Sequence, residues 1–339
     1  MKTNNKINNK TNNGVERVVK MFAERMAERM ETMQQQGKEW QKNWLCTTAS
    51  NMMPQNVQGR EYTAMNAFIL MMLAQLNEWQ IPVYMTLNKC NEMGAHVIKG
   101  AEAIPVLFWR VYAKNTETGA TIKVEDYNRL SKDERKNWKQ SATLRYYNVF
   151  NVAQTTIKED APKEYERLMK RANVVEQMDT DTDGMYCNAE LDDMMQTQSW
   201  VCPIRTKEQD RAYYSQTDDA IMLPCKYQFT GATRYDAGIE YYSTMLHEMA
   251  HSTGAETRLN RLQHTTFGSD VYAKEELVAE LTAALVGYRL GIATTINDNN
   301  ACYLASWAKV LKEEPRFIIS VLADVQKAQD MILAHLKRA

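Results

Sequence analysis

The sequence predicts an α+β protein built from two domains. Its 339 residues are enough for two hydrophobic cores. The segments 104–114 and 144–152 are rich in β-branched and aromatic residues, as strands are, and segments with helical spacing surround them. Charge divides the chain as well: residues 1–150 carry 21 Lys and Arg against 14 Asp and Glu, whereas the remainder carries 20 against 28. A basic half is therefore joined to an acidic half.

Four segments are expected along the chain. Residues 1–14 are rich in Asn and have no apolar core, which predicts a disordered tail rather than a signal peptide. Residues 15–154 are expected to form an α+β domain, 155–200 a charged linker, and 201–339 a mostly helical domain with a small β-sheet. No apolar run approaches a membrane span, and the six cysteines are scattered without a C-x-x-C pair. We therefore expect a cytoplasmic protein with no membrane partner.

The elements of the first domain follow from hydrophobic spacing. Val18, Met21 and Met26 recur at helical intervals, and the segment 66–78 is apolar almost all round, as in a buried helix. The predicted elements are, in order, a helix over 16–36, a helix over 66–78, a short strand over 82–86, a short helix over 87–93, and strands over 104–114 and 144–152. The polar stretch 115–140 is interpreted as a loop or an insertion.

The linker is expected to contain a charged helix over 159–177, with Asp160 as its N-cap, followed by an acidic loop. This loop satisfies the calcium-binding pattern D-x-D-x-D-G-x5-E at Asp179, Asp181, Asp183 and Glu190. The competing interpretation is an acidic linker whose Asp residues cap helices and turns. The sequence favours the linker, because Tyr186 replaces an aliphatic residue at the eighth position and no second loop pairs with this one.

The strongest motif is H-E-x-x-H at His247, Glu248 and His251, within a segment of helical character that ends near Gly254. Histidines four residues apart share a helix face, so both imidazoles can reach one metal ion, for which Zn²⁺ is the first expectation. Glu248 then lies beside the metal, where it can accept a proton from water. A chance match on an amphipathic helix is the alternative.

A catalytic zinc site needs a third protein ligand. Downstream, Glu276 and Glu280 share one face of a predicted helix, and E-x-x-x-E after H-E-x-x-H resembles the thermolysin-like layout. That resemblance implies Glu276 as the ligand and Glu280 as the group that orients a ligand histidine, or the reverse. The metzincin pattern fails because its third histidine would be Thr257, and His264 remains an alternative ligand.

Both halves of the chain resemble the ArdC-type antirestriction proteins of mobile elements. The matching N-terminal pieces are Gly59-Arg60-x-Tyr62, Tyr84-Met85-Thr86, Lys99-Gly100, Phe108-Trp109 and Tyr147-Asn148-Val149-Phe150-Asn151. The C-terminal match runs from Tyr213-Tyr214 through the H-E-x-x-H and Arg258-Leu259 to the E-E-L-V-A-E helix and Trp307. The resemblance implies a domain that binds single-stranded DNA, followed by a zincin-like metallopeptidase domain with an unidentified protein substrate. The chain departs from the family's pattern at Met249-Ala250 and at Pro82-Val83-Tyr84.

Single-strand binding without sequence preference requires aromatic faces for bases and cations for phosphates. The first domain interleaves both, and the candidate contacts are Arg60, Tyr62, Lys89, Lys99 and Trp109. Phe108 and Phe150 are expected in the core instead, because alternate strand residues face inward.

Two other functions stay open. The chain could be a non-catalytic protein that coats DNA and carries a structural or vestigial zinc site, or a protease that clears proteins from single strands. The presence of Glu248 favours an enzyme, because a structural zinc site has no need of a general base.

Overall fold

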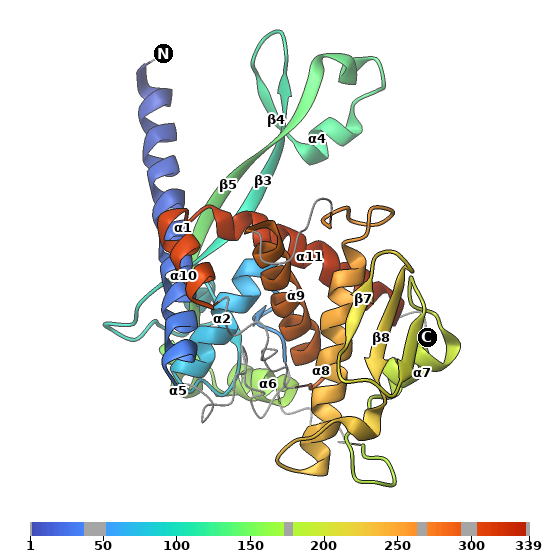
Figure 1. Cartoon of the computed structure of the whole chain (residues 1–339). Coiled ribbons are helices and arrows are strands. Elements are labelled where there is room, and N and C mark those ends of the chain that lie inside the picture. Colours follow the sequence, from blue (N-terminus) through green and yellow to red (C-terminus); the bar gives the residue numbers. More distant parts are fainter. Residues whose placement is uncertain (1, 37–51, 173–178, 263–269, 293–303, 337–339) are drawn as a thin grey trace.

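The computed structural model describes residues 2–36, 52–172, 179–262, 270–292 and 304–336. Figure 1 shows a mixed sheet with helices on the N-terminal side and a helical C-terminal half with a small sheet at its outer edge. The predicted α+β fold class is confirmed. His264, the alternative third ligand, lies outside the described residues.

The N-terminal sheet has five strands in the order β1-β2-β5-β3-β4. Their bounds are β1 Gln55–Asn56, β2 Val83–Met85, β3 Ile104–Asn115, β4 Thr121–Lys123 and β5 Trp138–Asn151. Among the described strands of this sheet, only β1 and β2 pair in parallel. Helices α2 (Ala64–Leu76) and α3 (Leu87–Glu92) flank this sheet, and α2 lies in the buried core as its composition predicts.

Strands β3 and β5 are longer than predicted. The segment 115–140, which is expected to be a loop or an insertion, contains regular structure: β4, helix α4 (Val124–Arg129), a 3-10 turn over Glu134–Asn137 and the beginning of β5. The β3–β5 ladder pairs every residue from Ile104 to Asn115 and projects beyond the body of the domain (Figure 1). We call residues 108–145 the arm. Four consecutive residues of β3, from Phe108 to Val111, are exposed, so neither face of the ribbon is covered there.

The first helix, α1, spans Lys2–Gln36, and its first turns fall in the segment 1–14, over which the sequence predicts a disordered tail. Extension of an existing helix costs little once its first turns form, and the part of α1 from Val15 to Met30 is anchored by buried side chains.

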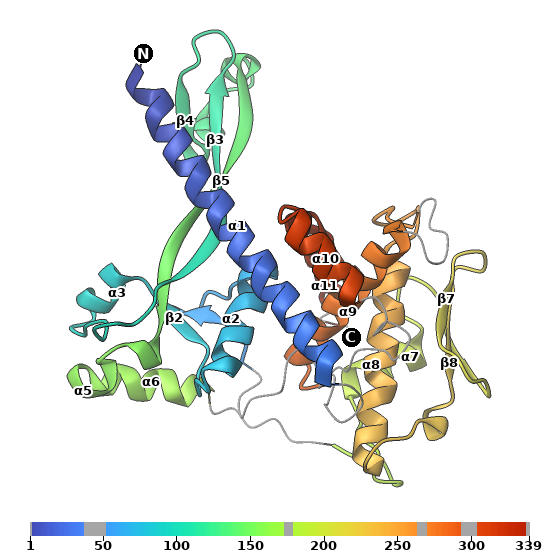
Figure 2. The same cartoon turned by 60° about the vertical axis from the view of Figure 1, so that its left-hand side comes forward.

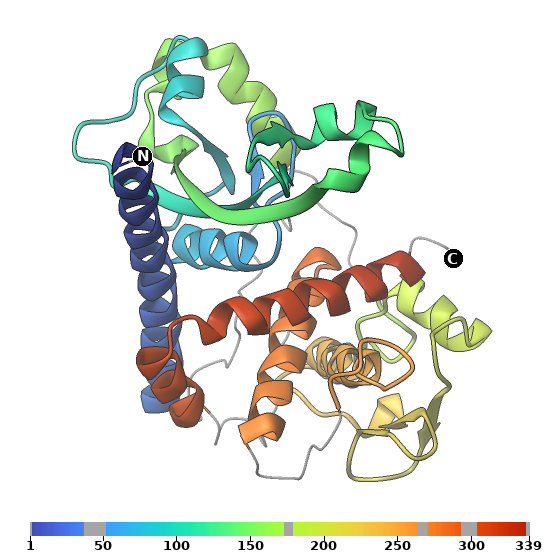
Figure 3. The same ribbon diagram turned by 90° about the horizontal axis from the view of Figure 1, so that it is seen from above.

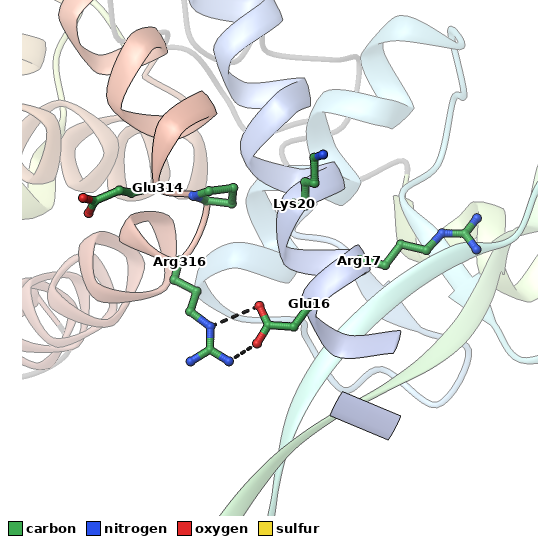
Figure 4. A pocket seen from close by; sticks show the side chains of 6 residues that line it. Glu16, Arg17, Lys20, Glu314 and Arg316 are labelled. Carbon is green, nitrogen blue, oxygen red and sulfur yellow. Dashed lines mark hydrogen bonds and ion pairs between the residues drawn. The ribbon is translucent and has the colours of Figure 1, made fainter. Parts of the chain in front are cut away.

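Helix α1 connects the two halves of the molecule. It lies along α10 (Leu304–Glu313) and meets the beginning of α11 (Phe317–Leu336), as Figures 2 and 3 show. At that corner Arg316 donates to both carboxylate oxygens of Glu16, with Arg17, Lys20 and Glu314 nearby (Figure 4). Phe22 and Met26 of α1 belong to the same buried cluster as Leu277 of α9 (Asp270–Arg289) and Trp307 of α10. The two domains therefore share one hydrophobic core.

In the segment 155–200, over which the sequence predicts a charged linker, the described residues form three helices. Helices α5 (Ile157–Asp160) and α6 (Pro162–Ala172) pack on the N-terminal domain through the buried Ile157 and Leu168. Helix α7 (Ala189–Thr197) packs on the C-terminal domain through Leu191 and Met194. The charged helix predicted over 159–177 is broken at Ala161, because a residue that precedes proline is pushed out of the α region. Asp160 is consequently the end of α5 and not an N-cap.

The C-terminal domain carries a three-stranded sheet in the order β6-β8-β7, with β6 Ile204–Lys207, β7 Tyr213–Ser215 and β8 Ala220–Pro224. Helix α8 (Arg234–Thr253) packs against this sheet on one side and against α9 (Asp270–Arg289) on the other. Gly238 of α8 lies against the backbone of Tyr186, where a Cβ atom would collide. No helix among the described residues is long and apolar enough to cross a membrane.

Candidate metal centre

Helix α8 positions the H-E-x-x-H motif in a buried environment. A capping box between Thr233 and Asp236 begins the helix, and Gly254 is its C-cap residue, as predicted. His247, Glu248 and the residues around them are buried, because α8 lies between the small sheet and α9. The motif is therefore held on a rigid helix, which is how a metal site of defined geometry is usually supported.

Three donor atoms converge between α8 and α9. The Nε2 atoms of His247 and His251 lie 3.0 Å apart, and Glu276 Oε2 lies 3.4 Å from the first and 3.6 Å from the second. Tetrahedral zinc, with ligand bonds of about 2.0–2.2 Å, requires ligand atoms about 3.3–3.6 Å apart. Within the described residues, these three form the only cluster of three or more His, Cys, Asp or Glu side chains with metal-binding geometry.

The other nitrogen of each imidazole faces a second carboxylate. Glu280 Oε1 lies 3.8 Å from His247 Nδ1, and Glu275 Oε1 lies 3.3 Å from His251 Nδ1. Carboxylates in this position fix the orientation of a metal-binding imidazole and raise its basicity. Glu276 thus lies where a ligand would, and Glu280 lies behind a histidine.

The sequence analysis missed Glu275 and its partner Arg261. Arg261 donates from Nε and Nη2 to the Glu275 carboxylate (3.0 and 2.9 Å) and from Nη1 to Thr253 Oγ1 (3.0 Å). It also donates to the carbonyl of Ala250 (3.0 Å), so it ties Glu275 to the end of α8. Glu275 stands directly before Glu276 in the sequence, but nothing local to Arg261 indicates this contact.

The charges of this group fit a divalent cation. Glu248, Glu275, Glu276 and Glu280 are each no more than 5% exposed, and buried carboxylates are costly unless they are paired or bind a metal. Burial by itself lowers an imidazole pKa, but the facing carboxylates outweigh it and raise the pKa of His251 well above its ordinary value. Burial raises a carboxyl pKa, yet the two imidazoles hold that of Glu276 far below its usual range. The buried carboxylates around the two histidines therefore favour binding of a metal cation.

Tyr214 of β7 forms a hydrogen-bonded cluster with Asp219 and Arg258. Its hydroxyl donates to Asp219 Oδ1 (2.7 Å) and accepts from Arg258 Nη2 (2.8 Å). Arg258 also donates from Nε to the carbonyl of Ser252 (2.6 Å), near the end of α8. This cluster fixes the turn between β7 and β8 to the metal-site helix.

The acidic loop is a hairpin, and its geometry does not favour calcium. Asp181 accepts from the backbone N–H groups of Asp183 and Met185 (3.0 and 2.9 Å), and Thr180 pairs with Tyr186 across the turn. The second carboxylate oxygen of Asp181 forms an ion pair with Lys226 Nζ (3.0 Å). Asp179, Asp183 and Glu190 belong to no metal-type cluster among the described residues. The alternative interpretation, Asp residues that stabilise turns and helix ends, agrees with this geometry.

The five candidate DNA contacts do not gather on one surface. Trp109 is 59% exposed on the arm. Arg60 is exposed in the turn after β1, whereas Tyr62 is half-buried with its ring edge-on to Tyr84. Lys89 forms an ion pair with Glu92 in α3, and Lys99 is exposed in the next turn; Figure 2 shows α3 far from the arm.

Phe108 is 41% exposed, so the prediction that it lies in the core is wrong. The alternation of strand residues was correct, but β3 continues beyond the body of the domain, where both faces meet solvent. Phe150, which lies nearer the body, is half-buried.

Comparisons with known proteins cover both halves. Residues 16–150 match the model of the N-terminal domain of anti-restriction factor ArdC, and residues 189–324 match that of a zincin-like metallopeptidase. The metal-free crystal structure of the antirestriction ArdC protein from plasmid R388 superposes with a TM-score of 0.65 at 23% identity, covering 93% of this chain and 98% of that one. The chain has the two-domain ArdC architecture.

The Mn(II)-bound structure of the same R388 protein matches this ArdC-type chain at 25% identity with a TM-score of 0.63, over 93% and 97% of the two chains. In sequence, the ArdC-type chain is 32% identical over 300 residues to the DNA primase TraC of Escherichia coli. That match covers 87% of this chain but only 25% of TraC. The zincin-like fold, the three converging donors and a manganese-bound relative together indicate a site for a divalent metal.

The three carboxylates that face the histidines differ in what their loss would do to metal affinity. We expect Glu276→Ala to weaken zinc binding more than Glu280→Ala or Glu275→Gln, because only Glu276 faces both Nε2 atoms. The other two substitutions leave the three donors in place and should cost about 10- to 100-fold in affinity. Competition titration with a chromophoric chelator measures all three. A larger loss in Glu280→Ala than in Glu276→Ala would exchange the two roles.

Proposed function

We propose that this chain is an antirestriction-type protein of a mobile element that binds single-stranded DNA and hydrolyses peptide bonds at a zinc centre. The observation that carries the hydrolytic part is the convergence of His247, His251 and Glu276 beside a buried Glu248. A purely structural zinc site is normally closed by four protein ligands, whereas three with a neighbouring acid suit catalysis. The family match to a zincin-like metallopeptidase supports the same reaction class.

In this proposal His247, His251 and Glu276 hold Zn²⁺, and Glu280 and Glu275 keep the imidazoles in the required tautomer. Bound there, the metal would supply a Lewis acid for the scissile carbonyl and would make water more acidic. The Glu248 carboxylate accepts the proton of the attacking water and delivers it to the leaving amine. Because Glu248 is buried, its carboxylate is kept from bulk solvent. The proton taken from the attacking water is therefore passed to the leaving amine and not to solvent.

The DNA-binding part rests on the match of residues 16–150 to the ArdC N-terminal domain and on the excess of cations in the first 150 residues. The proposed contacts from the sequence are Arg60, Tyr62, Lys89, Lys99 and Trp109. Tyr62 is the weakest of them, because its ring is engaged with Tyr84. The TraC relatives are named DNA primases, a further association with DNA.

We expect the full chain to bind single-stranded DNA with little sequence preference and with affinity that falls steeply as salt increases. Glu248→Gln should bind equally well, because Glu248 is buried in the other domain. Salt-titrated fluorescence anisotropy measures both proteins. The full chain is required, because the N-terminal segment shares its core with α9 and α10. Binding no tighter than that of a neutral control protein would remove the DNA-binding part of the proposal.

The experiment that tests the hydrolytic part is cleavage of an unfolded protein substrate by the zinc-loaded chain, with and without single-stranded DNA. Cleavage that requires zinc supports the proposal. Cleavage only when the substrate is bound to the same DNA strand would favour a protease that clears single strands. No cleavage under either condition, with zinc bound, would leave a DNA-coating protein.

A further inference from the structure

The arm has two chemically different faces. In an antiparallel ladder, directly paired residues point to the same face, and the face alternates along each strand. The pairs Phe108–Arg145, Arg110–Thr143, Tyr112–Ser141 and Lys114–Lys139 therefore share one face, together with Tyr147, Thr121 and Lys123. We call this set the basic face. The opposite face of β3 and β5 carries no cation: along the arm it presents Trp109, Val111, Ala113, Gln140, Ala142 and Leu144.

Among the described residues, no carboxylate pairs with the cations of the basic face. Arg110, Lys114, Lys123, Lys139 and Arg145 form no ion pair with any residue that the structure describes. The Nε atom of Arg145 is buried without a hydrogen-bond acceptor among the described residues.

Of the five acidic residues of the arm, Glu117 and Glu125 are exposed and form no ion pair with the described cations of the basic face, and the other three are engaged near the tip. Asp126 pairs with Arg129 (3.5 Å), and Asp133 pairs with Lys136 (2.8 Å). Glu134 accepts from the backbone N–H and hydroxyl of Ser131 (2.8 and 2.7 Å). They do not neutralise the strand cations, so the basic face keeps an uncompensated positive charge.

The basic face is also hollow and has exposed rings at one end. Seven of the ten residues that line a depression of about 890 Å³ belong to it, and none of the ten is acidic. Phe108 and Tyr147 are 41% and 39% exposed, with ring centroids 5.6 Å apart in an edge-to-face arrangement. From Phe108 to Lys114 the face extends about 20 Å along β3, at ~3.3 Å for each residue.

We propose that the basic face is the track on which single-stranded nucleic acid lies, with phosphates on the five cations and bases stacked on Phe108 and Tyr147. The inference rests on the DNA-binding part of the proposed function and gives it a site that lies on the face opposite to Trp109 and includes none of the five contacts proposed from the sequence. A single strand offers unstacked bases to the exposed rings, whereas a duplex buries its bases in its own stack. A β-ribbon can also enter a duplex major groove, so duplex binding is a necessary comparison.

The test uses the full chain and a fluorescent oligothymidine in salt-titrated anisotropy. Arg110→Ala/Lys123→Ala should lower the slope of log Kd against log salt by about 1.4, as expected for two lost phosphate contacts on a single strand. Phe108→Ala should weaken binding about 5- to 150-fold, whereas Phe108→Trp should keep it, since tryptophan also stacks. Lys158→Ala/Lys163→Ala, on exposed lysines of α5 and α6, is the charge-matched control and should leave the slope unchanged.

An unchanged slope in Arg110→Ala/Lys123→Ala, with tight binding by the wild-type chain, would overturn the site and leave DNA binding by the chain intact. Equal losses in the Lys158→Ala/Lys163→Ala control would also overturn it, since net charge alone would then explain the effect. Tighter binding of a duplex than of oligothymidine would refute the single-strand assignment. Failure of the wild-type chain to bind either would refute both this inference and the DNA-binding part of the proposed function.

Discussion

Glu248→Gln is expected to lower the rate of peptide hydrolysis by about 10²- to 10⁴-fold while the protein keeps its zinc. Glutamine has nearly the same shape as glutamate but cannot accept the proton of the attacking water. Glu248 is not one of the three converging donors, so zinc should remain bound. The measurement is the initial rate of cleavage of an unfolded protein substrate, with zinc content determined on the same sample.

The matched control for this substitution is Glu256→Gln, which makes the same chemical change at an exposed position shortly after α8. It should retain the wild-type rate. Full activity in Glu248→Gln would mean that another group acts as the base. Loss of zinc from Glu248→Gln would mean that Glu248 itself contacts the metal.

His247→Ala and His251→Ala are each expected to reduce bound zinc from about one ion per chain to background. Each substitution removes one of three converging donors, and the two that remain cannot complete a tetrahedral site. Elemental analysis after dialysis measures this loss. His335→Ala, on α11, is the control and should retain the metal, since His335 donates from Nδ1 to the carbonyl of Met331 (2.8 Å) and lies outside the cluster. Stoichiometric zinc in both motif variants would exclude α8 as the site.

The sequence predicted the parts of the site that one helix encodes. The spacing of His247 and His251 places both on one face of α8 in any helical conformation. Glu276 and Glu280 are also four residues apart, so spacing alone leaves their roles interchangeable. They are distinguished by the way α9 crosses α8, which brings Glu276 towards Nε2 of both histidines and Glu280 towards Nδ1 of one. The contact of Arg261 with Glu275 depends on the same crossing and on a turn after α8.

In the N-terminal half, the sequence predicted that strands exist but not how far they extend. The composition of 104–114 indicated a strand, but the polar residues of 138–143 gave no sign that β5 begins at Trp138. Backbone hydrogen bonds to β3 hold this polar segment in a strand, because a ribbon exposed to solvent accepts polar side chains on its faces. The two faces of the arm follow from the register between β3 and β5. No local sequence pattern predicts that Arg110 and Trp109 lie on faces of different chemistry.

Domain boundaries were the least predictable feature, because they depend on contacts between segments distant in sequence. Helix α1 packs on α10, and α5 and α6 return to the N-terminal domain although their charge suggested a linker. Glu61 forms an ion pair with Arg289 at the end of α9, the helix that carries Glu276. The two halves therefore meet at the helix that carries Glu276.

The most direct test of the central claim is anomalous diffraction at the zinc edge from crystals of the full chain grown with zinc. A strong peak is expected about 2.0–2.2 Å from His247 Nε2, His251 Nε2 and a carboxylate oxygen of Glu276. Glu248 should lie beside this peak without bonding to the metal. A protein saturated with zinc whose peaks all lie away from His247 and His251 would contradict the proposed metal centre.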